Sequence, residues 1–533
     1  MGIGGRQSFS VVHKASAMAN GRPSVLDSLP TDLIDCILAD LSLDDLRNLR
    51  LVSHGVNIAA SSEHFKSFCR TKTVVLSAPA LARLMDHITP GSIACHLQHL
   101  NITGVLFITS SLEKILRTKT EPADYMAIFG IRRGAHGEQA HFRSRRVPVS
   151  PESLVERQRE CEALRTRLEQ AALERSLGRD CSALVELFRR IRQPGVSHDL
   201  HSITLEVAVE RFLDRRSAPR HCDAWRPVCE TAAHTFQTTM RALAAAGLSL
   251  QRLDTFTGFS TCSLTSFDLG SMLDDHPADI FDGVLQDIRS FSICTSQRVQ
   301  LLIGFALDWA IPKRDDEVYE RRVVISDQDW QELSAHMQWS TVDEAEWEAT
   351  ATGPRDTTGL AQLLAKMSRL LYLGLLNSRL PYRVFDAFHT PEWGKTRFAH
   401  LVCASGLQRS KSITLCNHTA DHSDLLTFLE VNPDLQAVEF CDVSVKSSWQ
   451  PVFACLTKPQ SRITRLILGN LFESTATGVS YPIIIQGTPG GFASAAKVAF
   501  VVEGREAVLR GITYKQRELW PPPCVLHSVQ RQP

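Results

Sequence analysis

Short apolar runs with one spacing recur along most of the chain, and this feature constrains the fold more than any other. In each run an apolar residue is followed three residues later by a second and five residues later by a third. Positions two residues apart share one face of a β-strand, so the last two members predict a strand with one buried face. Seven runs are complete, namely Leu97–Leu100–Ile102, Leu200–Ile203–Leu205, Leu264–Phe267–Leu269, Ile288–Phe291–Ile293, Leu370–Leu373–Leu375, Leu435–Val438–Phe440 and Ile463–Leu466–Leu468.

The last runs also have a period. A partial run ends in Ile413 and Leu415, and the intervals from Ile413 to Val438 and from Val438 to Leu466 are 25 and 28 residues. This pattern resembles the strand half of a leucine-rich repeat, which recurs every ~20–29 residues. The Asn or Cys of that repeat is not regularly present, and the interval from Leu97 to Leu200 is 103 residues. The alternative is a mixed α/β domain with ordinary short strands.

The N-terminal residues 24–53 predict a pair of short helices. Apolar residues recur at helical spacing from Leu33 to Leu41, and Ser42 with Asp45 forms a variant capping box that opens a second helix. We expect a third short helix near Phe65. A unit this small buries little surface by itself. Its apolar faces therefore need a partner or a following domain to cover them, which indicates an interaction module.

Residues 29–53, LPTDLIDCILADLSLDDLRNLRLVS, resemble the F-box. Members of that family share an opening Leu-Pro, a helix of Leu and Ile, an Asp-Leu pair and a closing Arg-Leu-Val-Ser. The matching positions are Leu29, Pro30, Ile34, Ile37, Leu38, Leu41, Asp45, Leu46, Leu49, Arg50, Leu51, Val52 and Ser53. Val56 departs from the family, which often has an aromatic or large residue there, whereas Phe65 fits its trailing Phe. The alternative is an unrelated amphipathic helical hairpin.

The resemblance implies partners. F-box modules dock on a Skp-type linker protein, which joins them to a cullin scaffold, so the cullin would be an indirect partner. The resemblance assigns linker binding to Leu29, Pro30, Ile34, Ile37, Leu38, Leu41, Leu46, Leu49 and Val52. This order resembles that of many F-box proteins, especially fungal ones, in which poorly conserved repeats follow the F-box.

The expected fold class is α/β, with a small all-helical F-box module followed by an irregular leucine-rich-repeat-like solenoid with insertions. The divisions are a disordered N-terminus at 1–23, the F-box module at 24–72, the solenoid at 73–476, a terminal pair of β-strands at 477–504 and a poorly ordered, Pro-containing tail at 505–533. The insertions lie near 120–195 and 305–360. In the first of them, the spacing predicts a helix from Pro151 to Gly178.

Composition and motifs give no sign of a metal, a cofactor, nucleic acid or a membrane. Lys+Arg and Asp+Glu both total 58, so no overall field favours nucleic acid or an anionic membrane. The 14 cysteines are scattered without a CxxC pair. Cys416, His418 and His422 have no fourth ligand at a familiar zinc spacing. No apolar run approaches the ~18–20 residues of a membrane span. We therefore expect a cytoplasmic or nuclear protein.

The predicted function is that of a non-catalytic substrate receptor in an SCF-type cullin-RING ubiquitin ligase. No GxSxG, HExxH, P-loop or Rossmann motif indicates an enzyme. The alternative is an F-box scaffold that acts outside a ubiquitin ligase. In a leucine-rich solenoid the strands line the concave face. The residues expected to face a protein substrate are Gln436, Glu439, Asp442, Arg465 and Asn470.

Overall fold

The structure is a computed structural model of the chain. It describes residues 31–52, 57, 63–89, 92–122, 146–193, 200–212, 216–219, 225–258, 262–275, 280–296, 354–378, 407, 409–474, 480–485 and 500–516. The chain divides into two compact units, Met1–Arg70 and Thr71–Pro533. The expected disordered N-terminus and most of the insertion near 305–360 lie outside the described residues.

The first unit contains the helices α1 (Thr31–Ala39), α2 (Leu43–Leu49) and α4 (Glu63–Arg70). Ser42 begins α2 as the capping box predicted: its Oγ accepts a hydrogen bond from the Asp45 N–H at 3.3 Å and donates one to Asp45 Oδ2 at 2.6 Å. Helix α4 contacts both α1 and α2. Leu38 and Leu46 are fully buried, so they form the core of this small unit.

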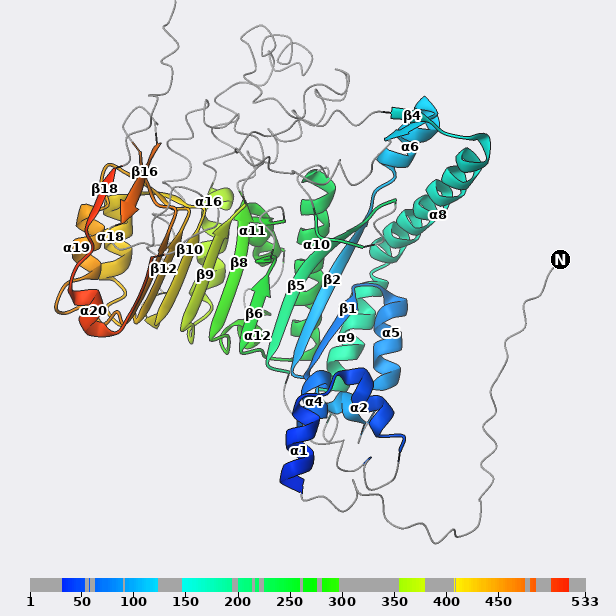
Figure 1. The fold of residues 1–533 in the computed structure, drawn as a ribbon, viewed down its shortest axis with the longest axis horizontal. Coiled ribbons are helices and arrows are strands. Elements are labelled where there is room, and N and C mark those ends of the chain that lie inside the picture. Colours follow the sequence, from blue (N-terminus) through cyan, green and yellow to red (C-terminus); the bar gives the residue numbers. More distant parts are fainter. Residues whose placement is uncertain are drawn as a thin grey trace, which may run out of the picture. The chain divides into compact units, whose positions relative to one another are not determined.

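The second unit is mixed α/β and is built on a large, mostly parallel sheet. Its strands follow the order of the chain: β1 (Thr71–Val75), β2 (His99–Phe107), β5 (Ser202–Glu210), β6 (Arg252–Thr255), β8 (Ser290–Ser296), β9 (Tyr372–Asn377), β10 (Ser412–Cys416), β12 (Ala437–Cys441), β14 (Arg465–Gly469) and β17 (Phe500–Glu503). Every pairing in this series is parallel except that of β17 with β14. Figure 1 shows these strands side by side.

The apolar runs lie in register across this sheet. One row of neighbours is Leu100, Ile203, Leu253, Phe291, Leu373, Ile413, Val438 and Leu466. The next row is Ile102, Leu205, Thr255, Ile293, Leu375, Leu415, Phe440 and Leu468. Both rows are buried in one continuous core. They share one sheet face because alternate residues of a strand point the same way.

Helices cover that face. The helices that contribute buried residues to this core are η2, a 3-10 helix (Ile93–His96), α5 (Ala78–His87), α9 (Arg179–Ile191), α10 (Trp225–Ala246), α11 (Ser266–Asp274), α12 (Asp282–Leu285), α16 (Pro354–Ala365), α18 (His422–Glu430), α19 (Gln450–Leu456) and α20 (Arg505–Leu509). Helices α6 (Ser110–Thr118) and α8 (Pro151–Ser176) bury residues in a separate small cluster, and β3 (Thr120–Pro122) pairs with β4 (Arg146–Pro148). Phe236 of α10, Phe428 of α18 and Phe453 of α19 all belong to the same core as the strand rows. The opposite face of the sheet is hereafter called the open face.

One predicted strand was wrong. In the run Leu264–Phe267–Leu269, only Leu264 lies in a strand, the short β7 (Leu264–Thr265) beside β8, and the other two residues lie in α11. Thr265 and Asp268 form a capping box, with the Asp268 N–H donating to Thr265 Oγ1 at 3.0 Å, and this starts the helix. The pattern also missed β1 and β6, and in β6 Thr255 takes the third apolar position. Its hydroxyl donates to the Ser292 carbonyl at 2.8 Å, which satisfies a buried polar group.

Sharp corners follow the last three parallel strands. Asn417, Asp442 and Asn470 have φ of 61°, 56° and 50°, a left-handed conformation that Asn and Asp tolerate better than most residues. Each corner turns the chain into a three-residue strand of a second sheet: β11 (Thr419–Asp421), β13 (Ser444–Lys446) and β15 (Phe472–Ser474). The short strands are again parallel and in chain order.

The C-terminal segment differs from the expected strand pair and tail. Strand β16 (Ser480–Ile485) pairs antiparallel with β15 and with β18 (Tyr514–Gln516), whereas β17 pairs with β14. The two strands therefore join different sheets. Residues 505–516 of the expected tail form α20 and β18, and β18 is held because the Tyr514 hydroxyl donates to the buried Glu473 Oε1 at 2.6 Å. Residues 517–533 lie outside the described part.

Candidate functional site

The helices of the first unit leave large apolar side chains in solvent. Leu33 and Ile37 of α1 are 52% and 44% exposed, and they lie one turn apart on one helix face. Leu51 and Val52, which follow α2, are 85% and 61% exposed. The Arg50 Nε–H beside them donates to Asn57 Oδ1 at 2.8 Å. Two large apolar residues exposed on one face of a helix are a candidate surface for binding another protein.

The residues predicted to bind a linker occupy three different environments. Ile37 and Val52 are exposed, whereas Ile34, Leu41 and Leu49 are partly buried. The fully buried Leu38 and Leu46 hold the helices together and present no surface to a partner. Leu29 and Pro30 lie outside the described residues. Leu33 and Leu51 were not in the predicted set, although the one-turn spacing of Leu33 and Ile37 was a usable signal.

The comparison with protein families identifies this unit. The model of the F-box domain matches residues 26–68. The chain contains an F-box domain. The match confirms the resemblance seen in residues 29–53, and an F-box domain implies a role in protein–protein interaction. The comparison with curated proteins found no match.

The open face of the sheet is a second candidate surface, and it is largely polar. The row between the two core rows contains Asn101, Thr204, Asp254, Ser292, Gly374, Thr414, Glu439 and Ile467. Several of these side chains are held by neighbours: Arg252 Nε–H donates to Asp254 Oδ2 at 2.7 Å, and Thr414 Oγ1–H donates to Glu439 Oε2 at 3.1 Å. The face therefore presents an ordered set of polar groups.

The five residues predicted to face a substrate do not gather in one place. Glu439 and Arg465 are on the open face, because they alternate with the buried Val438, Phe440 and Leu466 along their strands. Arg465 is exposed, and its Nε lies 3.4 Å from Glu503 Oε1. Gln436 is exposed before β12 begins. Asp442 and Asn470 occupy the left-handed corners instead of the strands.

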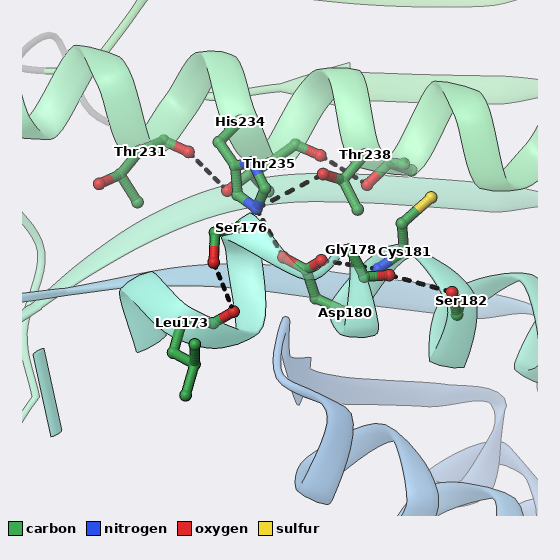
Figure 2. A network of polar contacts seen from close by, with 11 residues as sticks. Leu173, Ser176, Gly178, Asp180, Cys181, Ser182, Thr231, His234, Thr235 and Thr238 are labelled. Carbon is green, nitrogen blue, oxygen red and sulfur yellow. Dashed lines mark hydrogen bonds and ion pairs between the residues drawn. The ribbon is translucent and has the colours of Figure 1, made fainter. Parts of the chain in front are cut away.

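A cleft of about 200 Å³ lies over the first strands of the sheet unit, and sequence reasoning missed it. His234 of α10 and the buried Asp180 of α9 line it, and their Nε2 and Oδ2 atoms are 2.6 Å apart (Figure 2). Asp180 Oδ1 also accepts the Cys181 N–H at 2.8 Å. The two residues are 54 positions apart in the sequence, so no local pattern joins them.

The neighbours of this pair indicate a structural role. The Thr231 and Thr235 hydroxyls donate along α10 to the carbonyls of Pro227 and Thr231, both at 2.7 Å. A Cβ atom at Gly104 of β2 would lie 2.2 Å from Thr235 Oγ1, so α10 approaches the strand backbone closely there. We therefore interpret the His234–Asp180 pair as a connection that fixes α9 against α10.

Within the described residues, His, Cys, Asp and Glu form no group of three or more that could hold a metal ion. No helix in the same residues is long and apolar enough to cross a membrane.

Proposed function

We propose that this chain is the substrate receptor of an SCF-type cullin-RING ubiquitin ligase. Its F-box binds a Skp-type linker, the linker holds it on a cullin scaffold, and the sheet unit binds a protein substrate in the cytoplasm or nucleus. The observation that carries the proposal is an F-box domain at residues 26–68 that leaves four large apolar side chains in solvent.

The linker surface consists of Leu33, Ile37, Leu51 and Val52, and the family resemblance adds Leu29 and Pro30, which lie outside the described residues. Burying a Leu, Ile or Val side chain completely contributes roughly 1.5–3 kcal/mol. Because Leu33 and Ile37 are already half covered, docking gains about half of that at each, or about 1 kcal/mol. A difference of this size changes affinity roughly fivefold. The four side chains together contribute several kcal/mol, so one truncation weakens the complex only modestly.

The substrate surface is the open face of the sheet unit. We interpret this unit as an irregular leucine-rich-repeat-like solenoid, of the kind that follows an F-box in fungal-type receptors. The parallel strands in chain order and the repeated corners at Asn417, Asp442 and Asn470 support that interpretation. The receptor has no catalytic role. It acts by raising the effective concentration of substrate lysines near the recruited ubiquitin-conjugating enzyme.

Co-purification tests the proposal. The tagged full-length chain is expected to capture a Skp-type linker and a cullin. Ile37→Glu places a charge in the apolar surface and is expected to abolish both, whereas Arg465→Glu, an exposed charge change in the sheet unit, retains them. Capture of the linker without a cullin supports the alternative, a scaffold outside a ligase. If the unmodified chain captures neither the linker nor a cullin, both the ligase proposal and the scaffold alternative are overturned.

A further inference from the structure

Two cysteines from different repeats lie side by side on the open face. Cys416 ends β10, Cys441 ends β12, and the two residues are direct partners across these neighbouring parallel strands. They alternate with the buried Leu415 and Phe440, so both side chains point to the open face. Among the described residues, no other two cysteines are partners across neighbouring strands.

The backbone spacing suits a covalent link. Neighbouring strands are about 4.8 Å apart. The Cα atoms of cysteines joined by a disulfide are usually roughly 4.4–6.8 Å apart. Both thiols are reduced and partly exposed, so small oxidants can reach them. The buried cysteines of the core differ, because burial raises the pKa of the Cys229 thiol to about 12 and keeps it protonated.

The surroundings make the two thiols unequal. The Cys441 thiol donates to Glu439 Oε1 at 3.6 Å. Its hydrogen bond with Cys416, together with burial and the Glu439 carboxylate, raises the pKa of the Cys441 thiol far above the ordinary range. Because the Cys441 thiol holds its proton in the hydrogen bond to Glu439 Oε1, Cys416 is assigned as the sulfur that reacts first.

We propose that Cys416 and Cys441 form a redox-modification site, at which a hydroperoxide such as hydrogen peroxide converts the two thiols into a disulfide between β10 and β12. The Cys416 thiolate attacks one peroxide oxygen, so that an S–O bond forms, the O–O bond breaks and hydroxide leaves. The sulfur is oxidised and the peroxide is reduced. The Cys441 sulfur then attacks the Cys416 sulfur, so that the S–S bond forms and the S–O bond breaks. The Cys441 proton leaves with that oxygen as water.

The link would join two strands on the face proposed to bind substrate, directly beside Glu439. Its chemistry is independent of the ligase proposal, since it requires only the register of β10 and β12 and the access of peroxide. Reduction by a dithiol reverses it.

Peptide mapping of the full-length chain tests this site. The reduced protein is treated with hydrogen peroxide, its remaining thiols are alkylated with N-ethylmaleimide, and it is digested with trypsin. Residues 412–446 form one tryptic peptide that contains both cysteines, because no Lys or Arg precedes Lys446 within it. We expect this peptide to lose two hydrogens and to escape alkylation, and dithiothreitol to restore both thiols.

Three variants distinguish the specific disulfide between Cys416 and Cys441 from general oxidation of cysteines. Cys455→Ser removes a partly exposed cysteine on α19 and is expected to leave the linked peptide unchanged. Cys441→Ser is expected to leave a sulfenic acid on Cys416 that dimedone traps, whereas Cys416→Ser yields no such adduct on Cys441. The proposal fails if both positions are alkylated under conditions that oxidise the exposed Cys36. It also fails if the link forms as fast in denaturant as in the folded chain.

Discussion

The two units of the molecule treat the same residue types in opposite ways. In the F-box, Leu33 and Ile37 are about half exposed, whereas in the sheet unit the rows from Leu100 to Leu466 are almost completely covered by helices. A few short helices cannot cover all of their own apolar faces, but a large sheet with helices on one side can. Under the proposed function, the exposed Leu33 and Ile37 serve recognition, whereas the buried rows of the sheet serve stability, and exposure distinguishes these roles.

The largest expected effect is on the core of the sheet unit. Phe440 is fully buried, and its ring centroid lies 5.7 Å from that of Trp449. Phe440→Ala is expected to lower the free energy of unfolding by about 3–5 kcal/mol, because it leaves a cavity. Thermal unfolding measures this, and capture of the linker by the F-box should persist. A loss below about 1 kcal/mol would contradict the proposed burial.

Substitution of one isoleucine in each unit tests the difference between the two units directly. Ile413→Ala in the buried row of β10 is expected to cost about 2–5 kcal/mol of stability and to leave linker affinity unchanged. Ile37→Ala on α1 is expected to do the reverse, with little change in unfolding and roughly a fivefold loss of linker affinity. Denaturant titration and calorimetric binding provide the two readouts. Equal effects of both variants on stability would mean that Ile37 belongs to a core.

A pH titration tests the C-terminal end of the sheet unit. Burial, and then the hydrogen bond to Glu473, raises the pKa of Tyr514 above its ordinary value of 10.0. Because the folded state holds this proton more tightly, the stabilisation is complete below pH 10 and is lost as the pH rises through the folded pKa. Unfolding measured across the alkaline range should show this loss, and Tyr514→Phe should remove it. An unchanged alkaline slope in that variant would assign the effect to other groups.

The smallest expected effect on stability comes from the open face. Arg465 and Glu503 form an ion pair between two exposed side chains, so Arg465→Glu should change stability by no more than about 0.5 kcal/mol. Under the proposed function, the same change should alter which proteins co-purify. Glu439→Lys is expected to cost more, because Glu439 accepts hydrogen bonds from Thr414 and Cys441. Identical sets of captured proteins would remove Arg465 from the substrate surface.

The sequence predicted the sheet best where buried positions are apolar. The spacing at Leu435, Val438 and Phe440 identified a strand correctly, whereas β6 was missed because Thr255 fills a buried position through a hydrogen bond. The last strands also end in a common signal, a polar Asn or Asp two residues after the final apolar position, which the left-handed corners require.

The candidate sites were less predictable, because they depend on what covers each side chain. Helical periodicity placed Ile37 and Leu38 in one stripe, yet only packing against neighbouring helices makes Leu38 core and leaves Ile37 exposed. The contact between Asp180 and His234 depends on how α9 and α10 pack, and no spacing within either helix indicates it. Pairing between strands likewise brought Cys416 beside Cys441.

The antiparallel strand β17 has a consequence for self-association. A parallel sheet built from successive repeats ends in a row of unpaired N–H and C=O groups, on which a strand of another molecule can assemble. Strand β17 occupies that edge of β14, runs for only four residues and ends in the charged Glu503. A chain truncated before residue 500 would therefore expose this edge of β14 to pairing with a strand of another molecule.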